Sequence, residues 1–298
     1  MAAPLKHSLR ARRRPDFLVI GAYKSGTTSL FHELAAHPDI GVPAAKEVAH
    51  LVRPEVTHAN GLARYEAYFH PLRHYPIVGE VAPQYTAAPR WTGVAARARD
   101  ILGPDLKLIY IVRHPLDRIV SHLAHREAAA PELALGAQVP VGMFHEADIS
   151  RYGMQIDPWL SAFPRANLLV VTFEAYRDDP ASVRQALFTF LGAGDPPVKG
   201  PAVQANVTAN RRRKPDWLKR FLRHHAYRAY LQPLLPVKIR QQAGQLISRQ
   251  AYLKTGPAES MSETTRSVLH ETLKPDIADF YTKLGRTGPL WADFPLKP

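Results

Sequence analysis

Four short apolar runs limit how this chain of 298 residues can fold. They are rich in β-branched residues and lie at 17–20, 76–81, 107–112 and 167–173. Stretches with a helical spacing of apolar residues lie at 25–36, 91–102, 115–126 and 181–191. Strands this apolar are buried on both faces, and their alternation with helices is typical of parallel sheets. The sequence therefore predicts an α/β fold, a P-loop-like three-layer arrangement with a central parallel β-sheet flanked by helices.

The formal net charge of +13 is concentrated in two segments outside this alternating core. Residues 1–15 carry five Lys or Arg and no acid, and residues 205–240 carry ten against a single acid, Asp216. We expect a basic N-terminal arm over 1–15 and one domain over 16–298, with an α/β core to 194 and a mainly helical C-terminal part from 195. Each basic segment has two open interpretations, a surface for an anionic partner or an ordinary solvated surface.

The absence of cysteine excludes disulfides, thiolate metal sites and cysteine nucleophiles. No apolar run approaches the roughly 20 residues of a membrane-spanning helix, and the basic start is not followed by the apolar stretch of a signal peptide. His122 and His125 are spaced for a metal, but no carboxylate motif accompanies them. We expect a cytoplasmic protein with no membrane span and no metal.

A phosphate loop is predicted where the first strand meets the first helix, at 21–28. Unpaired backbone N–H groups and the positive end of a helix bind phosphate at such a junction. Lys24 precedes Gly26 here, whereas a Walker A loop has Gly-Lys-Ser/Thr, and the third strand ends in Arg113 instead of an acid for Mg²⁺. This order disfavours a P-loop kinase. A helix start capped by its own Ser and Thr, with no ligand, is the plainer alternative.

The run Lys24-Ser25-Gly26-Thr27-Thr28 resembles the 5′-phosphosulfate loop of the sulfotransferase superfamily. The resemblance implies 3′-phosphoadenosine 5′-phosphosulfate (PAPS) as co-substrate and 3′-phosphoadenosine 5′-phosphate (PAP) as product. It implies that Lys24 contacts the oxygen that bridges phosphorus and sulfur. The loop residues Ser25, Gly26, Thr27, Thr28 and Ser29 would hold the 5′-phosphate.

A second phosphate element begins at Arg113, which follows the third strand at the carboxyl edge of the sheet, where parallel sheets bind ligands. Arg113-x-Pro115 and the following helix resemble the family's 3′-phosphate element, which implies that Arg113 and Ser121 hold the 3′-phosphate. A guanidinium suits this anion because it donates two parallel hydrogen bonds. The Arg triplet around Arg212 loosely resembles a third donor-binding loop. A salt bridge to Asp117 and a solvated charge run are the respective alternatives.

The segment Lys46-Glu47-Val48-Ala49-His50 supplies the candidate base. Glu47 resembles the catalytic glutamate of the carbohydrate-type sulfotransferases, and a carboxylate can take the proton of an attacking hydroxyl. Lys24, with Lys46, would neutralise charge on the leaving phosphate. His50 is the rival base, since imidazole titrates near neutrality and the cytosolic branch of the family uses histidine. Lys46 and Glu47 could also form a surface ion pair of little energetic weight.

The segment 79–85 resembles the Glu-Lys-x-Pro-x-Tyr segment of the carbohydrate enzymes. We expect Glu80 and Tyr85, together with Lys46, to be substrate-binding residues on the acceptor side. Val81 stands where those enzymes have lysine, so any contact from that lysine is absent or supplied elsewhere.

The resemblance spans about 17–191, and more weakly 269–285. It implies a bacterial sulfotransferase of the heparan-sulfate type that transfers a sulfuryl group from PAPS to a hydroxyl or amine by in-line displacement. The partner would be a small-molecule or carbohydrate acceptor, not a nucleic acid; the acceptor and the oligomeric state stay open. The alternative from another class is a basic nucleic-acid-binding protein with a degenerate phosphate loop, which would show steeply salt-dependent binding.

Overall fold

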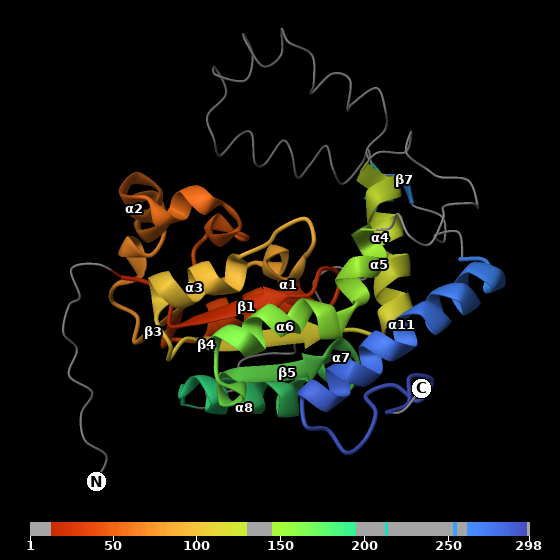
Figure 1. Ribbon diagram of the computed structural model, residues 1–298. Coiled ribbons are helices and arrows are strands. Elements are labelled where there is room, and N and C mark those ends of the chain that lie inside the picture. The colour runs from red at the N-terminus through yellow and green to blue at the C-terminus, as the bar shows by residue number, and fades with distance from the viewer. Residues whose placement is uncertain (1–12, 130–144, 195–211, 214–252, 255–260, 297–298) are drawn as a thin grey trace, which may run out of the picture.

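A five-stranded parallel sheet forms the centre of the computed structural model, which describes residues 13–129, 145–194, 212–213, 253–254 and 261–296 (Figure 1). The strands follow the order β2-β3-β1-β4-β5. They are β1 (Phe17–Gly21), β2 (Ile40–Gly41), β3 (Ile77–Val81), β4 (Lys107–Val112) and β5 (Leu168–Thr172). All four pairings are parallel, so the predicted parallel sheet is confirmed.

The central strand β1 is buried on both faces. Leu18 and Ile20 belong to one apolar cluster, whereas Phe17 and Val19 belong to the other, because alternate residues of a strand point to opposite faces. Gly79 of β3 lies beside Phe17, and a Cβ at that position would lie 2.1 Å from the Phe17 ring. The close approach of the two strands therefore requires glycine there.

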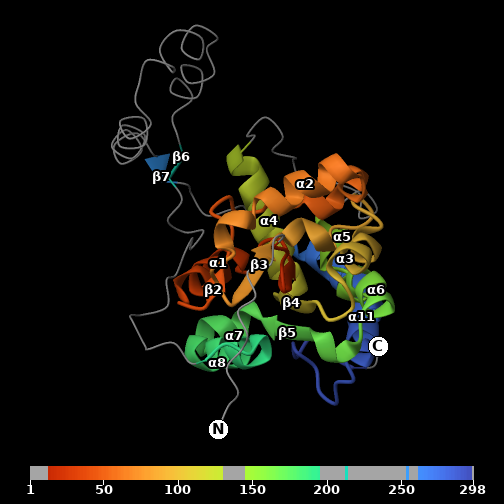
Figure 2. The same ribbon diagram turned by 90° about the vertical axis from the view of Figure 1, so that its left-hand side faces the viewer.

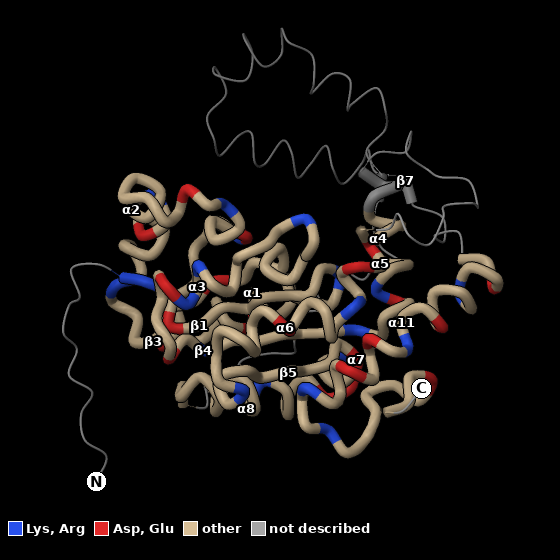
Figure 3. The backbone as a smooth tube through the Cα atoms, in the orientation of Figure 1, with Lys and Arg blue, Asp and Glu red and all other residues tan. Residues whose placement is uncertain are grey.

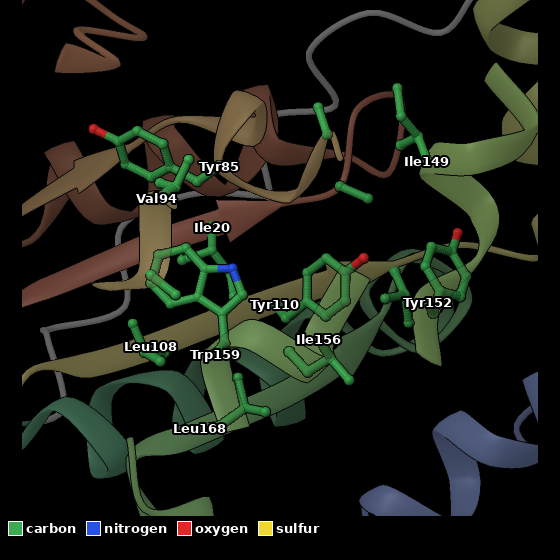
Figure 4. Close-up of a cluster of buried hydrophobic side chains, with 14 of the residues drawn as sticks. Ile20, Tyr85, Val94, Leu108, Tyr110, Ile149, Tyr152, Ile156, Trp159 and Leu168 are labelled. Carbon is green, nitrogen blue, oxygen red and sulfur yellow. The ribbon is translucent and has the colours of Figure 1, made fainter. Parts of the chain in front are cut away.

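Helices cover both faces of the sheet, which gives the three predicted layers (Figure 2). One face is covered by α1 (Thr27–Ala36), α7 (Phe173–Asp178) and α8 (Pro180–Leu191). The other is covered by α3 (Val94–Leu102), α4 (Pro115–Ala129), α6 (Tyr152–Ala162) and α11 (Glu263–Lys283). On that second face, Trp159 of α6 lies over Leu108 and among the large side chains drawn in Figure 4.

Several element boundaries differ from the prediction for local reasons. The first helix starts at Thr27, not at residue 25, because Gly26 before it is left-handed with φ of 94°. Left-handed Gly93 likewise delays α3 to Val94. The strand β5 ends at Thr172, whose hydroxyl accepts from the N–H of Ala175 and caps α7.

The connection from β2 to β3 and the turn after β3 consist of short elements that the sequence pattern did not show. They are η1 (His50–Val52), η2 (Pro54–Thr57), α2 (Ala59–Ala67), η3 (His70–Leu72) and η4 (Pro83–Thr86). Two more, α5 (His145–Ser150) and η7 (Arg165–Asn167), flank α6. Of these, η1 and η4 lie at the carboxyl edge of β3 and β1, where the candidate site lies, whereas η3 precedes β3 and α2 contacts Arg14 ahead of β1.

The C-terminal part is helical in α11, and β6 (Arg212–Arg213) pairs antiparallel with β7 (Leu253–Lys254). At the other end of the described chain, Arg13 pairs with Asp16 and Arg14 with Glu66, so these two residues of the expected arm already contact the body. In the described part of the chain, no helix is long and apolar enough to cross a membrane.

Candidate active site

The predicted phosphate loop runs from the end of β1 to the start of α1 and folds back on itself. The N–H of Ala22 donates to the carbonyl of Ile111 (2.7 Å), and that of Ser25 donates to the carbonyl of Ala22 (3.3 Å). No side chain caps the N-terminus of α1 at Gly26. The first N–H groups of a helix have no acceptor within it, so the positive end of α1 faces the loop.

Three non-glycine residues in the described part of the chain are left-handed, and all lie at this edge of the sheet: Lys24 (φ 67°), Glu47 (φ 64°) and Ala49 (φ 51°). This conformation costs a non-glycine residue about 1–2 kcal/mol. It persists where surrounding contacts fix it, often at functional sites. Two of the three are predicted site residues.

Arg113 lies against this loop. Its Nη1 is 3.5 Å from the carbonyl of Lys24, the outer limit of a hydrogen bond, and its guanidinium lies 4.9 Å from the centre of the Phe173 ring. Its backbone is held by Tyr152, whose hydroxyl donates to the Arg113 carbonyl (2.6 Å) and accepts from its N–H (3.3 Å). Burial raises the pKa of Tyr152 to about 12, so the hydroxyl keeps its proton.

Helix α4 reaches the same loop through Arg118, a fully buried residue. Its guanidinium donates to the Ser150 hydroxyl (2.5 Å), to the Glu146 carbonyl and to the Tyr23 carbonyl (3.5 Å). Burial lowers the pKa of Arg118 to about 10, which leaves it charged at neutral pH. It thus fixes α4 against both α5 and the phosphate loop.

Ser121 lies one turn further along α4 and is 8% exposed. Its neighbour His122 lies with its ring 5.8 Å from that of Tyr23. Burial, followed by the charges of Arg118 and Lys24, lowers the pKa of His122 to about 3. The structure therefore brings Lys24, Arg113 and the turn of α4 that carries Ser121 to one region.

The remaining loop residues differ in where their side chains lie. Ser25 is fully buried beside Tyr152, below the loop, and its N–H is already bonded to Ala22. Ser29 and Thr27 are also buried, within the first turn of α1. Thr28 is half-buried, and its hydroxyl accepts a hydrogen bond from Lys46 (2.8 Å).

Glu47 is held at both carboxylate oxygens. Oε1 accepts from the Lys46 ammonium and Oε2 from the side-chain amide of Gln84, each at 2.8 Å. The Glu47 side chain is 32% exposed. Burial and then the charge of Glu47 raise the pKa of Tyr23 to about 12, so the carboxylate lies near the residue that precedes Lys24. Lys46 therefore connects the candidate base to the phosphate loop.

Glu80 and Tyr85 lie beneath this segment. The strands of the sheet are mostly tan in Figure 3, the colour of uncharged residues. Within the five-stranded sheet, Glu80 and Lys107 are the only charged residues, and Glu80 is 1% exposed. Its carboxylate accepts from the N–H of Ala49 (2.7 Å) and from the hydroxyls of Tyr65 and Tyr85 (2.8 Å each). Tyr85 is 2% exposed. These positions do not fit the expected contact with an acceptor, because both side chains are covered and turned toward the backbone at Ala49.

His50 turns away from the phosphate loop. It begins η1 after left-handed Ala49, and its ring stacks on Tyr65 (6.0 Å) and meets the edge of Tyr68 (5.2 Å). Burial, then the charges of Arg53 and Arg64, lower its pKa. Its described contacts thus lie toward α2, whereas Glu47 is linked through Lys46 to the predicted phosphate loop.

Arg212 lies in β6, and the prediction for its side chain falls outside the described residues. Among the residues that the structure does describe, no group of three or more His, Asp or Glu side chains is placed to hold a metal ion.

Sequence reasoning missed the residues that hold the site together: Tyr23, Tyr65, Gln84, Arg118 and Tyr152. The hydrogen bonds Tyr65–Glu80, Gln84–Glu47, Arg118–Tyr23 and Tyr152–Arg113 join residues 15 to 95 positions apart in the chain. Helix α11 supports the site indirectly. Its residue Asp276 accepts hydrogen bonds from the N–H groups of Gly153 and Met154 (2.9 Å each) at the start of α6, the helix that carries Tyr152. No residue pattern along the chain reports such contacts.

Comparison with known proteins gives consistent matches. A family model described as a sulfotransferase domain matches residues 14–205. Heparan sulfate glucosamine 3-O-sulfotransferase 6 from Homo sapiens is 32% identical over 197 residues, which cover 63% of this chain and 55% of that protein. Bifunctional heparan sulfate N-deacetylase/N-sulfotransferase 4 from Mus musculus is 27% identical over 198 residues, with 60% and 22% covered.

The chain spans about half the length of the 3-O-sulfotransferases that it matches. Among solved structures, a sulfotransferase from Alicyclobacillus acidocaldarius has the same fold, with a TM-score of 0.61 and 21% identity. That match covers 92% of this chain and 97% of the other.

Proposed function

Because the chain belongs to the sulfotransferase family, we propose that it transfers the sulfuryl group of PAPS to a hydroxyl or amine by in-line displacement. The observation that carries the proposal is the position of Lys46. Its ammonium donates to Thr28 of the phosphate loop and to Glu47, each at 2.8 Å. A group that binds anions and a group that accepts protons are thus joined, as transfer between a phosphosulfate and an alcohol requires.

The phosphate loop would hold the 5′-phosphosulfate. The uncapped start of α1 supplies N–H groups and a positive dipole, and Lys24 and Lys46 supply charge. Arg113 and Ser121 would hold the 3′-phosphate, where the planar guanidinium can bind two oxygens at once. A nucleotide bound at both ends is fixed for in-line attack.

In the transfer step, Glu47 takes the proton of the acceptor as the acceptor oxygen or nitrogen forms its bond to sulfur. The bond between sulfur and the bridging oxygen breaks, and that oxygen leaves with its electron pair on PAP. Lys24 neutralises the charge that develops there. Because His50 stacks toward α2 while Glu47 is tied to the donor loop, the geometry supports Glu47 over His50 as the base.

A carbohydrate is the acceptor class we propose to test first, because the relatives at 32% and 27% identity are named for heparan sulfate. The family match does not favour the nucleic-acid-binding or kinase alternatives. We also propose that the protein works without a metal, since Lys24, Lys46 and Arg113 can carry the charge of the donor.

Donor binding is tested by thermal unfolding with PAP. We expect PAP at about 100 times its Kd to stabilise the protein by about 2.7 kcal/mol, and Arg113→Ala to remove most of that shift. The matched control is Arg177→Ala, an exposed arginine of α7 paired with Asp178, which should keep the shift. Equal stabilisation by AMP or ATP would contradict a site built for two separate phosphates.

Transfer itself is tested by incubating the protein with sulfur-labelled PAPS and a panel of acceptors. Heparan sulfate oligosaccharides, phenols and amines represent the acceptor classes. Label transferred to a member of the panel supports the proposal. Phosphate transfer from ATP with Mg²⁺, without use of PAPS, would overturn it.

A further inference from the structure

Gln84 contacts the candidate base directly, although no motif in the sequence points to it. It lies in η4, the turn that follows β3, and is half-buried. Its Nε2 donates to Oε2 of Glu47 at 2.8 Å. Its own Oε1 is buried and, in the described structure, has no hydrogen-bond partner. The NH₂ group of this amide, and not its oxygen, therefore makes the described contact.

The chemistry of Glu47 fixes the direction of this hydrogen bond. An ionised carboxylate only accepts hydrogen bonds, so the amide NH₂ of Gln84 must face it. The opposite orientation of the amide would place two oxygens together. The bond is also charge-assisted, which makes it stronger than one between neutral groups.

The turn that carries Gln84 is itself anchored on both sides. Tyr85 bonds to the buried carboxylate of Glu80, and the hydroxyl of Thr86 donates to the carbonyl of Ile20 in β1 (3.0 Å). Glu80 in turn holds the backbone at Ala49. The same short segment thus supports the backbone next to Glu47 and the side chain of Glu47, and a rigid support is what keeps a reacting group in place.

The two oxygens of Glu47 therefore have different partners. Lys46 binds Oε1 and reaches the donor loop, whereas Gln84 binds Oε2 and reaches the sheet. We infer that Gln84 is a positioning residue for sulfuryl transfer, which fixes the Glu47 carboxylate between the donor loop and the acceptor. This inference rests on the proposed role of Glu47 as the base.

The test compares Gln84→Leu with Gln84→Glu. Leucine has a similar size but no donor, and we expect it to lower kcat about tenfold. Glutamate is closer in shape to glutamine, but it places a second carboxylate against Oε2, so we expect a larger loss, about a hundredfold. KM for PAPS and the Kd for PAP should stay within about twofold. If Gln84 only filled space, glutamate would be the milder change.

Turnover is measured with PAPS and heparan sulfate oligosaccharides, and also as the slow release of PAP from PAPS with water as the acceptor. Gln185→Leu, at an exposed position of α8, is the matched control and should leave kcat unchanged. Gln84→Asn keeps the amide on a shorter side chain and should lie between wild type and Gln84→Leu. If Gln84→Leu does not bind PAP, Gln84→Asn is compared with Gln84→Glu in its place.

The inference is overturned if kcat is unchanged in both main variants, or if Gln84→Glu retains more activity than Gln84→Leu. Glu47→Gln, assayed beside them, separates this from failure of the proposed function. Full turnover by Glu47→Gln would refute Glu47 as the base, whereas loss of turnover there with no effect at Gln84 would refute the positioning role alone.

Discussion

The two halves of the site are built in different ways. The proposed donor half consists of two short junctions, the phosphate loop between β1 and α1 and the turn at Arg113 between β4 and α4. The base half, around Glu47, consists of left-handed residues and short turns that are held by side chains from Tyr65, Glu80 and Gln84. The path of the chain in the first half is therefore set locally, with Tyr152 and Arg118 supporting it from elsewhere, whereas long-range packing sets the path of the second half.

This difference predicts different responses to substitution. Changes in the proposed donor half should weaken nucleotide binding, with only a small loss in the free energy of unfolding. Changes in the base half should leave the nucleotide bound and reduce turnover, the free energy of unfolding, or both.

The largest expected effect is that of Glu47→Gln. The amide cannot take a proton from the acceptor, so kcat should fall by at least a hundredfold, the usual contribution of a positioned base. The Kd for PAP, measured by calorimetry, should change by less than about threefold. Loss of PAP binding together with turnover would break the comparison, because it would mean that the two halves depend on each other.

Glu80→Leu should have the next largest effect, on stability. It leaves the Ala49 N–H and the hydroxyls of Tyr65 and Tyr85 without their acceptor, so we expect the free energy of unfolding to fall by about 2–4 kcal/mol. Urea unfolding measures this. Glu80→Gln keeps one accepting oxygen and should cost less. Equal losses for the two variants would indicate that the cavity shape, and not the hydrogen bonds, is what matters.

The burial of Glu80 also predicts that the free energy of unfolding depends on pH. Burial raises its pKa above the ordinary value of 4.5, although hydrogen bonds from Tyr65, Tyr85 and Ala49 oppose the shift. A carboxyl with a raised pKa binds its proton more tightly in the folded state, so its stabilising contribution is complete below pH 4.5 and is lost as the pH rises through the folded-state pKa. The free energy of unfolding of wild type minus that of Glu80→Gln should fall over this window. A flat or rising difference would show that the hydrogen bonds outweigh burial.

The smallest expected effect is that of Gly26→Ala, which tests whether the phosphate loop contributes to the binding of PAP. Gly26 is left-handed, and a Cβ there would lie 2.9 Å from the Phe173 ring. We expect a loss of about 1–2 kcal/mol in the free energy of unfolding and a weaker Kd for PAP. Gly288→Ala is the matched control, since nothing lies within 4 Å of a Cβ at that position. An unchanged Kd for PAP would remove the phosphate loop from the proposed donor site.

The sequence predicted the path of the chain in the proposed donor half far better than in the proposed base half, and the reason is physical. The strands and the Lys24–Thr28 run are contiguous, so apolar patterning and the order of residue types are enough to place them. The choice between Glu47 and His50 was open because they lie three positions apart. The left-handed backbone of Ala49 sets the direction of the His50 side chain. The N–H of Ala49 donates to Glu80, which lies 31 residues further along the chain.

The expectation for Glu80 and Tyr85 shows the same limit. Polar residues at or just after the carboxyl end of a strand often face a ligand, and in sequence Glu80 lies at that end and Tyr85 follows it. In the fold, the 42–76 connection covers both side chains. The backbone N–H of Ala49 donates to the Glu80 carboxylate, and that of Leu51 donates to the Tyr85 hydroxyl. Whether a polar residue at a strand end meets a ligand or another loop depends on a segment whose path has no periodic pattern.

The link from α11 to Arg113 has a consequence for how the protein matures. Asp276 secures the first turn of α6, and Tyr152 in that turn secures the backbone of Arg113. Asp276 leaves the ribosome long after every residue of the phosphate loop. A nascent chain can therefore complete its sheet before the Asp276 contacts form that secure α6 and, through Tyr152, the backbone of Arg113.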